Sequence, residues 1–106
     1  MMNLNKMPLI YWSDATKISF LQRYIIVHSV LYYEKNESKI TDATFDATAK
    51  QLVKMQRENR EAFKRSQYYY CMKDFDGTTG FYLYSRLTEK DKKIINSIIF
   101  SMLRGD

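Results

Sequence analysis

Hydrophobic positions follow helical spacing over the first third of the chain. Side chains recur at alternating steps of three and four at Ile18, Leu21, Ile25, His28 and Tyr32. A parallel stripe, made of Phe20, Tyr24, Val27 and Leu31, widens this face to most of the helix circumference. Ser13 and Asp14 precede the pattern and offer an N-cap. The spacing predicts a largely buried helix that begins near residue 13 and ends near residue 34.

A second helix is predicted after a short polar connection at residues 34–39, which contains Asn36 and Ser38. Thr41 can cap this helix, and Asp42 in its first turn meets the positive end of the helix dipole. The helix is expected to run from about residue 42 to about residue 66, with an inward face of Phe45, Ala49, Leu52, Met55, Ala62 and Phe63. Two long amphipathic helices with a short link predict an antiparallel helical hairpin.

A last helix is predicted near the end of the chain. Residues 88–91 resemble a capping box, with Asp91 in place of the usual Glu or Gln, and Gly105 is a plausible terminator. Between them lies an apolar cluster of Ile94, Ile95, Ile98, Ile99, Met102 and Leu103. This helix is apolar enough that we expect it to pack across the hairpin or to contact a protein partner.

Residues 67–87 support two interpretations. A short β-hairpin over residues 68–84 would turn at Asp76 and Gly77, a strong type I′ signal. Alternatively, the second helix continues through Met72, the chain turns at residues 76–80, and a short helix capped by Thr79 follows. The helical interpretation is favoured, because a lone two-stranded hairpin is only marginally stable. The predicted fold is therefore mainly α, with one domain over residues 1–106 that divides into a hairpin (13–66) and a C-terminal extension (67–106).

Composition narrows the class of protein without defining its activity. The chain of 106 residues carries a formal charge of +5, one cysteine and one histidine, so an internal disulfide is excluded and a zinc site is not expected. Residues 1–12 lack a clear period, and their apolar Ile10, Tyr11 and Trp12 are expected to pack onto the body. With no signal peptide or membrane-spanning run, the expected location is the cytoplasm. Richness in Lys, Asn, Ile and Tyr is typical of AT-rich bacterial genomes and their phages.

Candidate chemistry gathers where the two predicted hairpin helices meet. Tyr32 and Tyr33 lie in the last turn of the first helix, and Asp42, Phe45 and Asp46 lie on one face of the second. Aromatic rings can stack on a cationic heterocycle, and carboxylates can accept hydrogen bonds from ribose hydroxyls or an amide. A nicotinamide riboside has this combination of groups. His28, one turn before Tyr32, is expected to be a satisfied core histidine.

The pattern H-x-x-x-Y-Y-x-x-x-x-x-x-I-x-D-A-x-F-D over residues 28–46 resembles the N-terminal helical-hairpin domain (Ia) of bacterial NAD-dependent DNA ligases. In that family the domain caps the nicotinamide mononucleotide half of NAD. The resemblance implies that Tyr32 and Tyr33 match the family's aromatic or histidine pair. It likewise implies that Asp42, Phe45 and Asp46 match its Asp-x-x-Tyr-Asp triplet, so that NAD or nicotinamide mononucleotide is the expected cofactor.

Several positions depart from the family pattern. Asn36 and Ser38 replace the Asp and Pro of the connecting loop, Thr44 replaces an acidic residue, and Phe45 lacks a tyrosine hydroxyl. The family's adenylated lysine lies in a Lys-x-Asp-Gly motif of a separate domain. Lys73 has one residue too many before Asp76 and Gly77 and is rejected as a nucleophile. We therefore expect a stand-alone, non-catalytic relative of the capping domain rather than an enzyme.

An alternative function uses the hairpin only as a scaffold. Four basic residues recur along one stripe of the second predicted helix, at Lys50, Lys54, Arg57 and Lys64. Such spacing permits binding to a polyanion such as DNA. However, Glu58 and Glu61 lie among them, and mixed charge is typical of an ordinary solvated surface. Under this alternative the chain would be a small basic interaction protein, encoded by a phage or prophage, that binds DNA or a protein.

Overall fold

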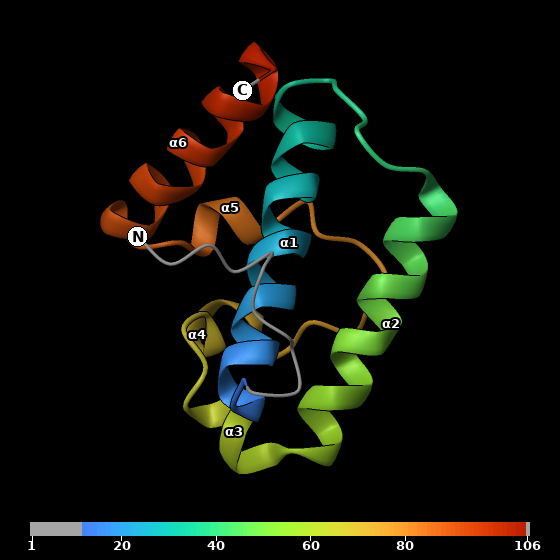
Figure 1. Ribbon diagram of the computed structural model, residues 1–106, viewed down its shortest axis with the longest axis vertical. Coiled ribbons are helices and arrows are strands. Elements are labelled where there is room, and N and C mark those ends of the chain that lie inside the picture. Colours follow the sequence, from blue (N-terminus) through green and yellow to red (C-terminus); the bar gives the residue numbers. More distant parts are fainter. Residues whose placement is uncertain (1–11, 106) are drawn as a thin grey trace.

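The computed structural model describes residues 12–105, which contain six helices and no β-strand (Figure 1). In chain order the helices are α1 (Asp14–Glu34), α2 (Asp42–Glu58), α3 (Arg60–Lys64), α4 (Tyr69–Met72), α5 (Leu83–Arg86) and α6 (Glu89–Arg104). The predicted mainly α fold is therefore confirmed, and the alternative β-hairpin over residues 68–84 is wrong. Of the arm predicted at the N-terminus, only Trp12 lies within the described residues, and it is buried.

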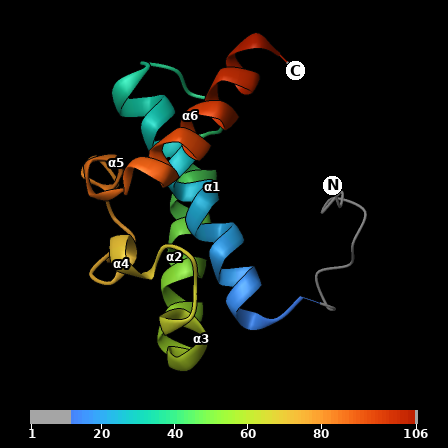
Figure 2. The ribbon, with the colours of Figure 1, turned by 90° about the vertical axis from the view of Figure 1, so that its left-hand side faces the viewer.

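Helix α1 is the centre of the fold. Seven consecutive residues, 25–31, are buried, which over two helical turns means that the helix is covered on every side. Helices α2, α3, α5 and α6 all contact it, as Figures 1 and 2 show from two directions. Two residues of the predicted buried face, Phe20 and Tyr32, are instead 41% and 53% exposed.

No described helix has the length and apolar character needed to cross a bilayer.

The predicted helix ends are formed by short polar side chains and a glycine. The hydroxyls of Ser13 and Thr41 accept the backbone N–H groups three residues later, at Thr16 and Thr44. The Thr41 hydroxyl also donates to the hydroxyl of Thr44, a bond between two side chains that differs from the backbone contact of a capping box. At the C-terminus, Gly105 adopts a left-handed φ of 80° and its N–H bonds to helix carbonyls. The predicted roles of Ser13, Thr41 and Gly105 are therefore confirmed.

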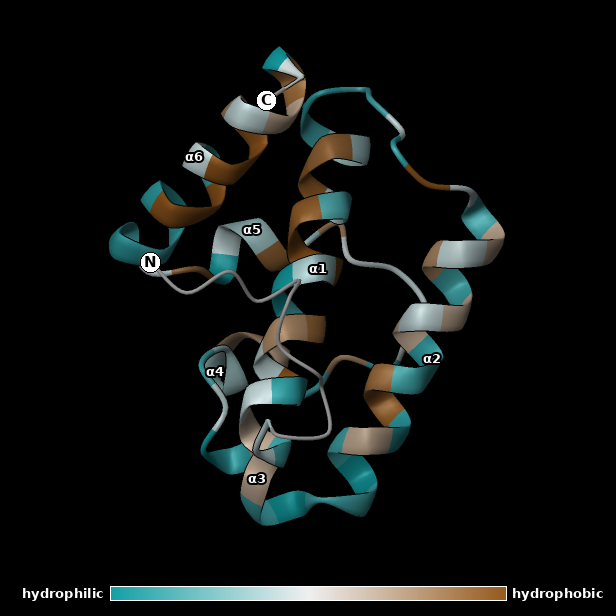
Figure 3. Ribbon diagram, viewed as in Figure 1, coloured by the Kyte–Doolittle hydropathy of each residue, from teal (hydrophilic) through white to brown (hydrophobic). Residues whose placement is uncertain are grey.

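The predicted second helix is interrupted at Asn59, so its expected continuation to residue 66 is wrong. Asn59 leaves helical geometry with φ −126° and ψ 63°. Both its backbone N–H and its side-chain amide donate to the carbonyl of Met55. Asparagine side chains compete in this way with the backbone hydrogen bonds of a helix and are therefore common at helix ends. The break redirects α3 so that Ala62 and Phe63 remain buried beside α1. Figure 3 shows that the junction between α2 and α3 is largely hydrophilic.

Residues 65–88 form two short helices joined by an irregular segment. The predicted extension of the second helix through Met72 is wrong, since the chain turns after α3 and begins again at α4. The predicted turn at residues 76–80 is present, with Gly77 at a φ of 89°. Thr79 does not cap a helix, because α5 begins only after Tyr82.

Helix α6 packs on the C-terminal half of α1, as predicted for the apolar last helix (Figures 1 and 3). Ile95 and Ile99 are buried, while Phe100 and Leu103 remain exposed. At its start, Thr88 accepts the N–H of Asp91, but the Asp91 carboxylate does not return to Thr88. Instead the Tyr70 hydroxyl donates to Asp91 and accepts the N–H of Thr88. A tyrosine from α4 thus completes the cap and ties α6 to the preceding segment.

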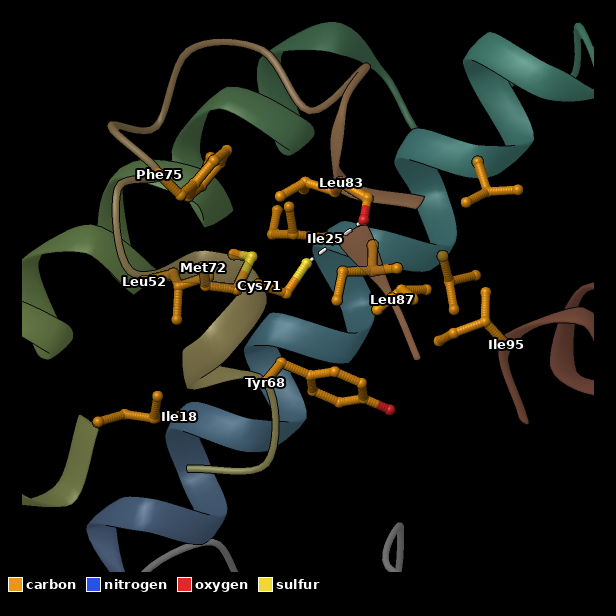
Figure 4. Close-up of a cluster of buried hydrophobic side chains, with 14 of the residues drawn as sticks. Ile18, Ile25, Leu52, Tyr68, Cys71, Met72, Phe75, Leu83, Leu87 and Ile95 are labelled. Carbon is orange, nitrogen blue, oxygen red and sulfur yellow. Dashed lines mark hydrogen bonds between the residues drawn. The ribbon is translucent and has the colours of Figure 1, made fainter. Parts of the chain in front are cut away.

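The extension after residue 66 shares one core with the hairpin. Tyr68, Met72 and Leu83 are completely buried beside Ile25 and Leu52 (Figure 4). The single cysteine, Cys71, belongs to the same core, and its thiol donates to the carbonyl of Leu83. Burial raises the pKa of this thiol to about 11, so it is protonated at neutral pH and is a poor nucleophile.

Candidate functional site

A cavity of about 270 Å³ lies where α1 ends and α2 begins. It is lined by His28, Ser29, Tyr32, Tyr33, Ser38, Lys39, Ile40, Thr41, Asp42, Phe45, Asp46 and Thr78. All five residues predicted to hold a cofactor therefore line one cavity. The hairpin geometry explains this arrangement, because it brings the last turn of α1 next to the first turns of α2.

The aromatic residues of the cavity come from both helices. Tyr32 and Tyr33 follow each other on α1 and form an edge-to-face pair with ring centroids 4.8 Å apart. Their side chains are 53% and 48% exposed, so ring surface is open to a ligand. Phe45 on α2 is half-buried and packs against the core. The cavity therefore offers flat apolar surface on two of its sides.

Two carboxylates lie on the α2 side of the cavity. Asp42 and Asp46 are one helical turn apart and exposed, and neither carboxylate forms a hydrogen bond or ion pair within residues 12–105. The neighbouring hydroxyl of Thr41 is already used by the helix cap. Lys39 is the one cation among the described lining residues, and it too has no ion pair there. The cavity edge thus combines two available acceptors with one cationic donor.

His28 and Ser29 add buried polar atoms to the cavity. His28 is only 9% exposed and its ring contacts Tyr24 with centroids 4.4 Å apart. Neither His28 Nδ1 nor Ser29 Oγ has a hydrogen-bond partner among the described residues. The predicted burial of His28 is confirmed, but the prediction that its nitrogen atoms are satisfied is wrong for Nδ1. Both positions could have been found from the sequence, since each lies four residues before a predicted site tyrosine.

Burial of His28 lowers the pKa of its imidazole below the ordinary value of 6.5. Below about pH 6.5 the unfolded chain therefore binds more protons than the folded chain. Burial of His28 thus leaves the free energy of unfolding unchanged above that pH and lowers it as the pH falls. We expect the urea midpoint of the wild-type protein to fall between about pH 7 and about pH 5. A His28→Leu variant should show a smaller decrease over the same range. Equal decreases in the two proteins would exclude this origin.

The predicted basic stripe is only partly assembled. Lys50, Lys54 and Arg57 line a shallow depression on α2, but Lys64 lies on the separate helix α3. Lys54 pairs with Glu58 at 3.9 Å, and Lys64 pairs with Glu61 at 3.7 Å. These exposed pairs reduce the local positive charge that would attract a polyanion. DNA binding through this stripe stays a prediction.

Comparison with known proteins gives one informative match. A stretch of 51 residues, 48% of this chain, is 40% identical to a DNA ligase from Endomicrobium trichonymphae. The match covers only 8% of that ligase, so the shared part is a small piece of a much larger protein. No protein-family model matches the sequence, and no solved structure gives a significant match. The chain therefore contains a segment related to a DNA ligase.

Proposed function

We propose that this protein binds the nicotinamide mononucleotide half of NAD in the cavity between α1 and α2. In this role it is a non-catalytic relative of the cofactor-capping domain (Ia) of NAD-dependent DNA ligases. The observation that carries the proposal is the convergence of Tyr32, Tyr33, Asp42, Phe45 and Asp46 on one cavity. The sequence similarity to a DNA ligase also supports the proposal, and it covers only a segment of that enzyme.

The groups around the cavity match the chemistry of this ligand. The pyridinium ring is flat and cationic, and an exposed tyrosine ring can stack on it. The carboxylates of Asp42 and Asp46 can accept hydrogen bonds from the ribose hydroxyls, and these bonds are strengthened by the negative charge. Lys39 can approach the phosphate from the cavity edge. The cavity thus supplies a counterpart for each part of the mononucleotide.

The neutral state of His28 adds a further point of support. A buried imidazole with a lowered pKa is uncharged near pH 7 and does not repel a pyridinium cation. Its Nδ1 is buried and has no partner among the described residues, so the ring adds no positive charge to this side of the cavity.

Calorimetry with nicotinamide mononucleotide tests the proposal. About 20 non-hydrogen atoms at about 0.3 kcal/mol each predict a Kd on the order of 10–100 μM for the wild-type protein. Loss of a charge-assisted hydrogen bond in Asp46→Ala should weaken binding roughly 10- to 100-fold. Loss of stacking in Tyr32→Ala should weaken it roughly 3- to 30-fold.

Matched controls remove similar groups outside the cavity. Asp14→Ala removes an exposed carboxylate from the first turn of α1, and Phe100→Ala removes an exposed ring from α6. Both controls should bind the mononucleotide as the wild type does. The proposal fails if the wild-type protein gives no binding heat. It also fails if Asp46→Ala and Tyr32→Ala bind as tightly as their controls.

A further inference from the structure

The cavity has a second wall that comes from the C-terminal extension. Thr78, in the irregular segment between α4 and α5, lines it together with residues of α1 and α2. The resemblance that suggested a nicotinamide site lies in residues 28–46, so this wall belongs to a different part of the chain. Figure 1 shows the segment crossing from α5 towards α2 and back to α4.

Side-chain contacts hold the segment against the cavity tyrosine. The hydroxyls of Tyr33 and Thr79 share a hydrogen bond of 3.0 Å. The Tyr33 ring also meets Phe81 edge-to-face, with centroids 6.4 Å apart. One of the aromatic residues of the site is therefore held in place by two residues of the extension.

Two glycines allow the segment to approach both hairpin helices. A Cβ atom on Gly77 would lie 3.3 Å from the Val53 side chain on α2. A Cβ atom on Gly80 would lie 2.2 Å from the Oγ of Ser29 on α1, which is too close for any larger residue without movement. Both glycines are buried. The segment therefore packs tightly on α1 and α2, and this packing fixes the position of the second wall relative to the two helices.

The wall is also ordered internally. The Asp76 carboxylate accepts hydrogen bonds from the backbone N–H of Thr78, at 3.0 Å, and from its hydroxyl, at 2.6 Å. Because its proton is engaged, the Thr78 hydroxyl can only accept a further hydrogen bond. A ribose hydroxyl is a suitable donor. The wall is thus preorganised for the sugar, which reduces the entropy cost of binding.

We propose that residues 76–80 close the site around a mononucleotide, so that it takes nicotinamide mononucleotide in preference to intact NAD. This inference rests on the proposed function. The cavity of about 270 Å³ is slightly smaller than the roughly 300–1,000 Å³ typical of ligand pockets, which suits one nucleotide and not two. The second wall occupies space beside the site, so the adenosine half of NAD would be held outside the cavity. Its confinement beside the wall would cost entropy that no new contact offsets.

Parallel titrations with nicotinamide mononucleotide and NAD test the preference. The wild-type protein should bind the mononucleotide about 3- to 10-fold more tightly than NAD. Thr79→Val, which keeps the side-chain shape but removes the bond to Tyr33, should weaken mononucleotide binding about 3- to 10-fold and reduce the preference. Tyr33→Phe removes the same bond from the other side and should behave alike.

Thr16→Val is the matched control for these two variants. Thr16 lies in the first turn of α1, at the end of the helix opposite the cavity, and it is exposed. Its hydroxyl shares a hydrogen bond of 2.9 Å with the hydroxyl of Ser13, so the substitution also removes one bond between two hydroxyls. The backbone N–H of residue 16 still reaches Ser13, which preserves the helix cap. This control should bind both ligands as the wild type does.

The outcomes separate this inference from the proposed function. If mononucleotide and NAD bind equally well and both bond-removing variants match Thr16→Val, the closing wall is overturned while mononucleotide binding stands. If neither ligand binds the wild type, both proposals fail. Hydrogen exchange gives an independent readout, since the amides of residues 76–80 should become protected when the mononucleotide is added. Unchanged exchange in this segment would contradict a wall that contacts the ligand.

Discussion

Replacing Gln22 with leucine is expected to lower the free energy of unfolding by about 2–5 kcal/mol. Gln22 is completely buried, and its amide joins three parts of the fold. Its Nε2 donates to Gln56 Oε1 at 3.0 Å and to the Ser66 hydroxyl at 2.9 Å. Its Oε1 accepts the backbone N–H of Tyr68 at 3.1 Å. Leucine has a similar size, so the effect would come from buried polar groups that lose their partner.

Urea unfolding followed by circular dichroism measures this effect. Gln51→Leu, which makes the same change on the exposed side of α2, should alter stability by less than about 0.5 kcal/mol. The double variant Gln22→Leu, Gln56→Leu should recover part of the loss, because one of the orphaned side chains becomes apolar. It should not recover all of it, since the N–H of Tyr68 still lacks an acceptor. Similar stability of Gln22→Leu and Gln51→Leu would contradict the role assigned to this network.

Leu83→Ala is the second substitution with a large expected effect, a loss of about 2–5 kcal/mol. Leu83 is completely buried at the start of α5, where its side chain packs into the core shared with α1 and α2 (Figure 4). It also lies directly beside Gly80 at the end of the cavity wall. The cavity left by alanine would weaken the attachment of the extension to the hairpin.

This substitution also tests whether residues 13–66 and 67–106 unfold as one unit. Fluorescence of the single tryptophan, Trp12, and circular dichroism of the helices should report the same, lowered midpoint in Leu83→Ala. Leu103→Ala is the matched control, since Leu103 is 43% exposed on α6, and its midpoint should stay close to that of the wild type. Two separate transitions, with the Trp12 signal unaffected, would show that the extension is an independent unit.

The sequence pattern predicted the local features well because local chemistry controls them. Ser13 and Thr41 cap helices through bonds to N–H groups three residues away, and such bonds depend only on neighbouring residues. The left-handed conformation of Gly105 at the end of α6 likewise depends only on neighbouring residues. The prediction was wrong where a distant residue decides the outcome. Tyr70 enters the cap of α6 from 21 positions before Asp91, and no local pattern indicates such a contact.

The candidate site also combines features that local sequence predicts with features that depend on distant residues. Its five predicted residues lie within one turn-connected stretch, so helical periodicity alone places them at one end of the hairpin. His28 and Ser29 share that periodicity, but their lack of hydrogen-bond partners among the described residues depends on what packs around α1. Thr78 had no signal in the sequence, since it lies far along the chain from both hairpin helices and in a segment without regular structure.

By itself, the sequence determined the hairpin, its caps and the set of side chains at its open end, because periodicity and capping act over three to four residues. The tertiary structure alone decided that Gln22 is buried among polar partners and that residues 76–80 lie against the cavity. Both features join residues that are distant in the chain. Such contacts form only when the whole core is packed, and a local pattern does not encode them.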